Sequence, residues 1–160
     1  MVGVVSAALL TSAGAVNATP TKNTIYVDGT KVNGAAYMIN NNNYFKLRDI
    51  AAMVNGSSKQ FEVSWNETNK RIDLTTNKAY TVVGGEMALP SSAMKTAKES
   101  KASVFKDGNK ADYTGYNISD NNYYKLRDVA WILNGTGSEF NVTWDGANNR
   151  ILLSPNAPYV

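Results

Sequence analysis

Residues 42–56 read NNYFKLRDIAAMVNG, and residues 121–135 read NNYYKLRDVAWILNG. These stretches belong to a longer repeat, in which residues 25–80 match residues 104–159 at a constant offset of 79 without a gap. About 24 of the 56 aligned positions are identical. A match of this length indicates an internal duplication, so we expect two copies of one structural unit.

Each quoted stretch has apolar residues at the spacing i, i+3, i+4 and i+7, which places them on one face of a helix. In the two copies these residues are Leu47, Ile50, Ala51, Val54 and Leu126, Val129, Ala130, Leu133. Asn55-Gly56 and Asn134-Gly135 follow directly and suit a left-handed helix end. Asp49 and Asp128 lie in the first turn, where the helix dipole favours a carboxylate by about 0.3–1 kcal/mol.

The residues around each helix alternate between apolar and polar, as in half-buried strands. Before the first helix, residues 24–27 and 36–39 predict two strands, the first of which enters a tight turn at Asp28-Gly29. After the helix, an alternating hairpin is expected to pack its apolar side on the helix through Phe61, Val63, Trp65, Ile72 and Leu74. The expected fold class is therefore α+β, with two tandem modules, each a small antiparallel β-sheet packed on one α-helix.

The repeat also predicts domain boundaries. Residues 24–85 form the first module, residues 86–101 a linker rich in Ala, Ser and Lys, and residues 102–160 the second module. The first copy continues beyond its last aligned position, whereas the second stops at Val160. The second module is therefore expected to be truncated.

The first 18 residues are mostly small and apolar and end in Val16-Asn17-Ala18, the small-x-small pattern of a signal-peptidase site. We expect residues 1–18 to be a signal peptide and the mature chain to have no stable membrane insertion. A membrane anchor is the alternative, although the run is short for a spanning helix, which needs about 20 apolar residues. An exported chain without cysteine fits a bacterial protein that is secreted or associated with the cell surface.

Composition narrows the possible chemistry. The absence of Cys and His removes the usual zinc and copper ligands, the Ser-His-Asp triad and a thiol nucleophile. The net charge of +3 comes from dispersed residues and forms no stripe typical of nucleic-acid binding. The acidic residues lack the spacing of a calcium loop, and folding accounts for the repeated ones. We therefore predict no catalytic residue, metal site, cofactor or nucleic-acid partner, and we do not expect an enzyme.

The ordered motifs resemble a known family. They are Asp28-Gly29, Tyr44 to Ala51, Asn55-Gly56, Val63 to Asn66 and Arg71 to Leu74, each repeated in the second copy between Asp107 and Leu153. This order is similar to that of the copper amine oxidase N-terminal domain, or stalk domain, of exported Gram-positive proteins. One departure is a lysine, Lys46 or Lys125, where many relatives have a proline at the helix start. The resemblance implies a non-catalytic appendage, because the copper ligands and quinone cofactor of that family lie in a separate domain.

Aromatic residues are the candidate ligand contacts. Trp131 replaces Ala52 of the first copy and lies about 140° around the helix from Leu126, away from the apolar stripe. Packing against the linker or the other module is the alternative role for Trp131. Tyr44 and Tyr124 lie near Asn-rich turns, where alternation predicts one buried and one surface residue in each aromatic pair. A surface aromatic there could form part of a saccharide-binding ledge.

The Arg-Asp pair is repeated as Arg48-Asp49 and Arg127-Asp128. Each pair could stabilise the fold or bind an anion, and the sequence favours the structural role. The function expected from the sequence is a non-catalytic, exported cell-envelope module that acts as a spacer or interaction domain. The alternatives are a carbohydrate- or peptidoglycan-binding module and an appendage of a larger secreted enzyme. The expected partner is a cell-wall polysaccharide or another envelope protein.

Overall fold

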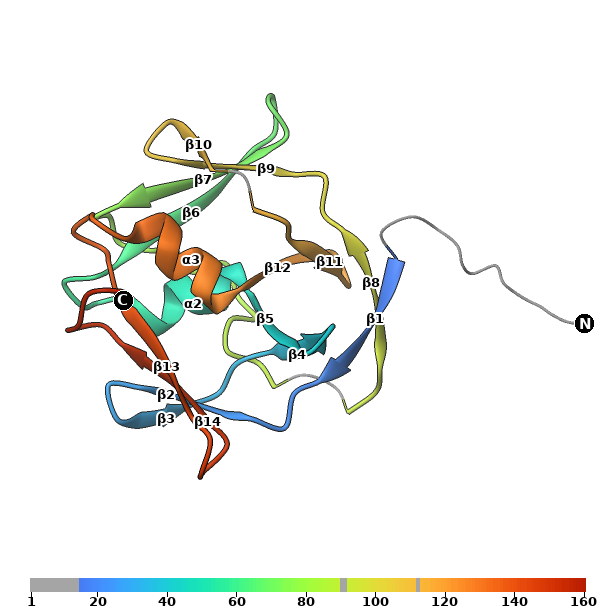
Figure 1. Ribbon diagram of the computed structural model, residues 1–160. Coiled ribbons are helices and arrows are strands. Elements are labelled where there is room, and N and C mark those ends of the chain that lie inside the picture. Colours follow the sequence, from blue (N-terminus) through green and yellow to red (C-terminus); the bar gives the residue numbers. More distant parts are fainter. Residues whose placement is uncertain (1–14, 90–91, 112) are drawn as a thin grey trace, which may run out of the picture.

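The computed structural model describes residues 15–89, 92–111 and 113–160. Strands take 45% of these residues and helices 11%, so the α+β prediction is wrong and the fold is mostly β. A closed barrel of six antiparallel strands lies beside two further sheets of four strands each (Figure 1). Neither helix in the described ranges is long and apolar enough to cross a membrane.

Each element of the first copy has a counterpart in the second. The first copy contains β1 (Ala15–Pro20), β2 (Thr24–Val27), β3 (Thr30–Val32), β4 (Ala36–Ile39), β5 (Asn42–Lys46), α2 (Leu47–Val54), β6 (Phe61–Asn66) and β7 (Arg71–Thr76). The second contains β8 (Lys95–Glu99), β9 (Ser103–Lys106), β10 (Asn109–Ala111), β11 (Tyr116–Ile118), β12 (Asn121–Lys125), α3 (Leu126–Leu133), β13 (Asn141–Asp145) and β14 (Arg150–Ser154). The duplication in the sequence is therefore also a duplication in structure.

The two copies share every sheet. The barrel order β1-β4-β5-β12-β11-β8 takes three strands from each copy. In the other sheets, β7 pairs in parallel with β9, and β14 pairs in parallel with β2. An isolated hairpin has open edges and is only marginally stable. Here a hairpin of one copy pairs with a hairpin of the other copy to form each four-stranded sheet. The prediction of two tandem modules, each with its own sheet and helix, is therefore wrong.

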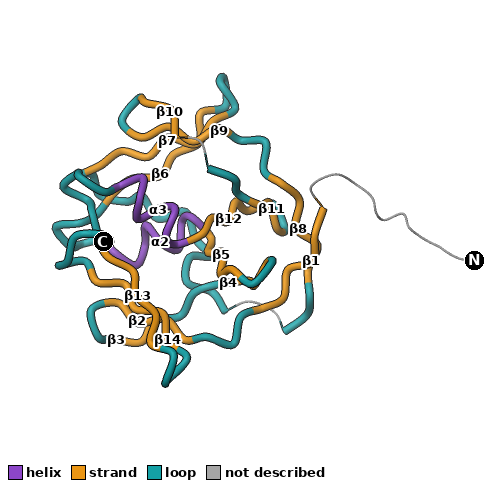
Figure 2. Tube along the Cα trace, in the orientation of Figure 1, coloured by secondary structure: helices purple, strands orange, loops and turns teal. Residues whose placement is uncertain are grey.

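The main core lies between the helix pair and the two four-stranded sheets (Figure 2). The predicted helix faces are confirmed, since each of their residues is at most 4% exposed. Gly56 and Gly135 have φ values of 83° and 80° and follow the helix ends as predicted. Asp28 and Gly29, with φ values of 49° and 81°, form the predicted tight turn between β2 and β3.

The barrel has a second core, made of tyrosines and small residues. Its tyrosines form two edge-to-face pairs, Tyr37 with Tyr123 at 5.5 Å and Tyr44 with Tyr116 at 5.2 Å between ring centroids. The β5–β12 pair separates this interior from the helix layer and is buried on both faces. Aromatic residues on both sides of these strands are therefore core residues.

The predicted signal peptide and the predicted linker both contribute strands to the barrel. The first 14 residues of the predicted signal peptide lie outside the described residues, and its last four begin β1. Part of the predicted linker forms β8, which pairs antiparallel with β1, with Val16 opposite Ala97. Ala18 and Ala97 are fully buried beside the barrel tyrosines. Both strands therefore belong to the folded core.

Candidate binding clefts

Two clefts of similar size lie where the copies meet. The Trp144 cleft has a volume of about 320 Å³, and its polar and aromatic lining residues are Asn23, Asn41, Asn42, Asn43, Phe45, Lys125, Arg127, Thr143 and Trp144. The Trp65 cleft has a volume of about 350 Å³, and its corresponding lining residues are Lys46, Arg48, Ser64, Trp65, Asn117, Asp120, Asn121 and Asn122. Most of these residues occupy equivalent positions in the repeat, so the two clefts are two versions of one site.

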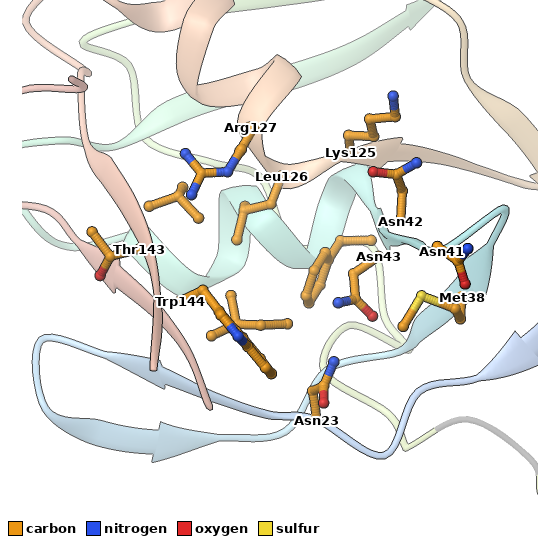
Figure 3. A pocket seen from close by; sticks show the side chains of 13 residues that line it. Asn23, Met38, Asn41, Asn42, Asn43, Lys125, Leu126, Arg127, Thr143 and Trp144 are labelled. Atoms are coloured by element: carbon orange, nitrogen blue, oxygen red, sulfur yellow. The ribbon is translucent and has the colours of Figure 1, made fainter. Parts of the chain in front are cut away.

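Each cleft takes one wall from each copy. In the Trp144 cleft, Asn41 to Asn43 come from the β4–β5 turn and β5 of the first copy, whereas Lys125, Arg127 and Trp144 come from the second. Figure 3 shows the asparagines on one flank and Trp144 on the other, with Leu126 between them. The Trp65 cleft exchanges these contributions. A separate copy would therefore contain neither complete cleft.

The turn beside each cleft needs residues that tolerate positive φ. Asn40 and Asn41 have φ values of 49° and 66°, and Ser119 and Asp120 have 50° and 68°. Asn and Asp adopt this conformation more readily than most residues. The Asn-rich sequence thus serves two purposes, since it forms the turn and presents amide groups at the cleft wall.

The tryptophan in each cleft lies near the end of its strand. The prediction that Trp65 packs in the core is wrong, because it is 44% exposed, while Phe61 and Val63 on the same strand are buried as predicted. Trp144 is 50% exposed at the equivalent position of β13. The signal in the sequence was a tryptophan kept at the same strand end in both copies, beside a polar turn.

The arginine in each cleft has a different environment. The Nη1 atom of Arg48 donates hydrogen bonds to the Val63 carbonyl at 3.2 Å and to the Tyr80 hydroxyl at 3.4 Å. The Tyr80 hydroxyl donates in turn to Glu86 at 2.5 Å. Arg127 is exposed and has no hydrogen bond or ion pair with any residue that the structure describes. Arg48 is therefore a structural group, whereas Arg127 is available to a ligand.

The carboxylate next to Arg48 is also used by the fold. Asp49 is fully buried and accepts backbone hydrogen bonds from Ala35 at 3.1 Å and Met87 at 2.9 Å. Burial raises the pKa of Asp49, although the bonds from Met87 and Ala35 act in the opposite direction. These bonds account for Asp49 without a ligand.

The predicted contact residues do not lie together. Tyr44 and Tyr124 are only 6% and 2% exposed, so neither reaches a surface open to a ligand. Trp131 is 56% exposed and packs edge-to-face on Tyr159, at 6.2 Å between ring centroids, in its own copy. It borders a separate depression and lines neither cleft. Ligand contact by Trp131 remains a prediction.

Comparisons with known proteins do not assign the clefts. No family model matches the chain, and neither a curated protein nor a solved structure matches it. Among the described residues, no group of three or more acidic side chains is placed to hold a metal ion. The functional interpretation therefore depends on the geometry and chemistry of the clefts.

Proposed function

We propose that this chain is a non-catalytic saccharide-binding module of the bacterial cell envelope, with one binding site in each cleft. The observation that carries the proposal is the repeated combination of an exposed tryptophan with an amide-bearing wall. An indole ring offers a flat apolar surface on which a sugar ring can stack. Asparagine amides both donate and accept hydrogen bonds, as recognition of sugar hydroxyls requires.

The size of the clefts supports a small polar ligand. Volumes of about 320 and 350 Å³ lie at the lower end of the range for small-molecule sites. The linings also contain apolar residues, among them Leu126 and Ile151 in one cleft and Leu47 and Ile72 in the other. A lining with both apolar and polar residues suits a short saccharide unit, which has both apolar ring faces and hydroxyl groups.

The cell-envelope setting comes from the sequence. The small apolar N-terminal stretch and the resemblance to stalk domains both favour an exported protein, and a cell-wall polysaccharide is the proposed partner. A spacer would need neither cleft. An interaction module of the envelope, alone or joined to a larger enzyme, would use both.

The three tryptophans provide a direct test in the intact chain. In a ¹⁵N-labelled sample, the indole N–H groups of Trp65, Trp144 and Trp131 report on the two clefts and on a surface away from them. Titration with chitotetraose should move the signals of Trp65 and Trp144 and leave that of Trp131 unchanged. The Trp65→Ala and Trp144→Ala variants should assign the signals, and each should lose binding at its own cleft.

Two outcomes would contradict the proposal. If no indole signal moves with chitotetraose or with a cell-wall disaccharide, the clefts do not bind saccharides. If only the Trp131 signal moves, binding takes place on the α3 surface and the clefts are not the site.

A further inference from the structure

The two clefts differ in charge at equivalent positions. Asp120 lines the Trp65 cleft, and Glu67 accepts a hydrogen bond from the Trp65 indole Nε1 at 3.3 Å. The corresponding positions beside the Trp144 cleft are Asn41 and Gly146, which carry no charge. Each cleft also has one lysine and one arginine in its wall. The lining of the Trp144 cleft therefore has two cations and no acid, whereas Asp120 offsets one of the two cations that line the Trp65 cleft. Glu67 lies outside that lining and forms an ion pair with Lys70.

The cations also differ in their availability. Arg48 is held by the Val63 carbonyl and the Tyr80 hydroxyl. Within the described part of the chain, Arg127 has no such bond, and Figure 3 shows its guanidinium on the same flank of the cleft as Thr143. A free guanidinium can bind a carboxylate through two parallel hydrogen bonds without first losing a protein partner.

An amide in the Trp144 cleft also lacks a partner. The Oδ1 atom of Asn43 is buried and accepts no hydrogen bond from the described residues. In the other copy, the equivalent Oδ1 of Asn122 accepts a hydrogen bond from the Ser100 hydroxyl at 2.7 Å. A buried acceptor without a donor is costly. The Asn43 Oδ1 atom has almost no accessible surface, so it marks a difference between the copies and is not a ligand contact.

We infer that the Trp144 cleft selects a saccharide that bears a carboxylate, whereas the Trp65 cleft takes neutral saccharides. This inference rests on the saccharide binding proposed above. Arg127 pairs with the carboxylate, and Trp144 stacks on the ring. N-acetylmuramic acid, which differs from N-acetylglucosamine by a lactyl ether with one carboxylate, represents the chemical class.

Two acids near the Trp144 cleft do not cancel its charge. Asp145 follows Trp144 but does not line the cleft, and its carboxylate accepts a hydrogen bond from Asn148 at 2.9 Å. Asp128 also lies outside the lining, although it interacts electrostatically with Lys125. Asp49 lies at the equivalent position near the Trp65 cleft, so this acid is common to both sites. Asp145 has the neutral counterpart Asn66, and Glu67 has the neutral counterpart Gly146, so each cleft has one unmatched acid outside its lining. The charge difference between the linings therefore lies at Asp120 and Asn41.

The test compares two disaccharides that differ in this carboxylate. The indole signals of the intact chain would be followed during titration with chitobiose and with the N-acetylglucosamine–N-acetylmuramic acid disaccharide. At Trp144 the acidic disaccharide should bind about tenfold more tightly, as expected for one charge-assisted pair. At Trp65 the two affinities should agree within about twofold. Arg127→Gln should bring the ratio of the two affinities at Trp144 to about one.

A reciprocal exchange provides the matched control. Asn41 and Asp120 have nearly the same backbone conformation, with φ values of 66° and 68°, so exchanging their side chains should preserve the turns. Asn41→Asp should lower the affinity of the Trp144 cleft for the acidic disaccharide, and Asp120→Asn should raise that of the Trp65 cleft. Chitobiose is titrated in parallel, and the ratio of the two affinities in each variant isolates the effect of the exchanged charge.

The outcomes separate this inference from the proposed function. Equal affinities for the two disaccharides at both tryptophans, with no effect of Asn41→Asp, would overturn the charge selection and leave saccharide binding intact. If neither disaccharide moves either cleft signal, both proposals fail. Binding of the acidic disaccharide that is unaffected by Arg127→Gln would also overturn the inference.

Discussion

The same Arg-Asp pair begins both helices, but within the described residues the two pairs have different neighbours. The segment after β7 brings Tyr80 to Arg48 and the backbone of Met87 to Asp49. In the second copy, Arg127 is exposed and Asp128 is partly buried. Identical residues therefore have different roles, because what packs on them decides whether they hold the fold together or face a ligand.

The strongest test of this comparison is to separate the copies. Chains spanning residues 15–89 and 92–160 should each be unfolded alone, because every sheet takes strands from both copies. Circular dichroism should show a cooperative unfolding transition for the full chain and for a mixture of the two pieces. A cooperative transition in either piece alone would mean that a copy is an independent module after all.

The next largest effect should come from removing the buried carboxylate. Asp49→Asn places an NH₂ group against a backbone N–H, and should lower the free energy of unfolding by about 1–3 kcal/mol. Asp128→Asn is the matched change at the open position and should cost less than about 0.5 kcal/mol. Urea denaturation of both variants measures the difference. Equal losses would show that the covering segment does not decide the role of this residue.

The covering segment should also respond to acid. Burial tends to raise the pKa of Glu86, but hydrogen bonds from Tyr80 and from the backbone of Val83 and Gly84 lower it from 4.5 to about 2. Glu86 therefore contributes stability above pH 4.5, and this contribution is lost as the pH falls towards 2. Asp49 acts in the opposite direction, because its pKa is raised and its burial costs less once it is protonated.

Glu86→Gln isolates the contribution of Glu86 to the pH dependence. Thermal unfolding measured between pH 5 and pH 2 should show a smaller acid-induced loss for the variant than for the unmodified chain. A loss of the same size in both proteins would mean that Glu86 does not hold the segment in place.

The cleft tryptophans should also contribute little to stability. Trp65 and Trp144 are about half exposed, so replacing either with Ala should lower the free energy of unfolding by about 1 kcal/mol or less. Binding should respond differently, because each replacement removes the stacking surface of one cleft. A large loss of stability in Trp144→Ala would assign this residue to the core and weaken the binding proposal.

Local patterns predicted the helices and turns well. A helix depends mainly on residues close together in the sequence. The apolar stripe from Leu47 to Val54 and the glycine that follows predicted this helix and its end, and the structure confirms the helix and the burial of its stripe. The exchange of strands could not be predicted in this way. β2 has the same alternation whether it pairs with a strand of its own copy or with β14.

The candidate site was missed for a related reason. Alternation placed Trp65 on the same face as Phe61 and Val63, but it could not show that the strand end lies in a cleft wall. The same rule predicted an exposed member in each aromatic pair of β5 and β12, where both faces are covered. Periodicity identifies the face of a strand, but the neighbouring elements determine whether that face is buried.

The most direct test of the central claim is co-sedimentation with purified Gram-positive cell walls. The account predicts that the unmodified chain and Trp131→Ala pellet with the walls, while the Trp65→Ala/Trp144→Ala double variant stays in solution and still unfolds in one cooperative transition. The account would be contradicted if the double variant pelleted like the unmodified chain, or if Trp131→Ala alone abolished binding.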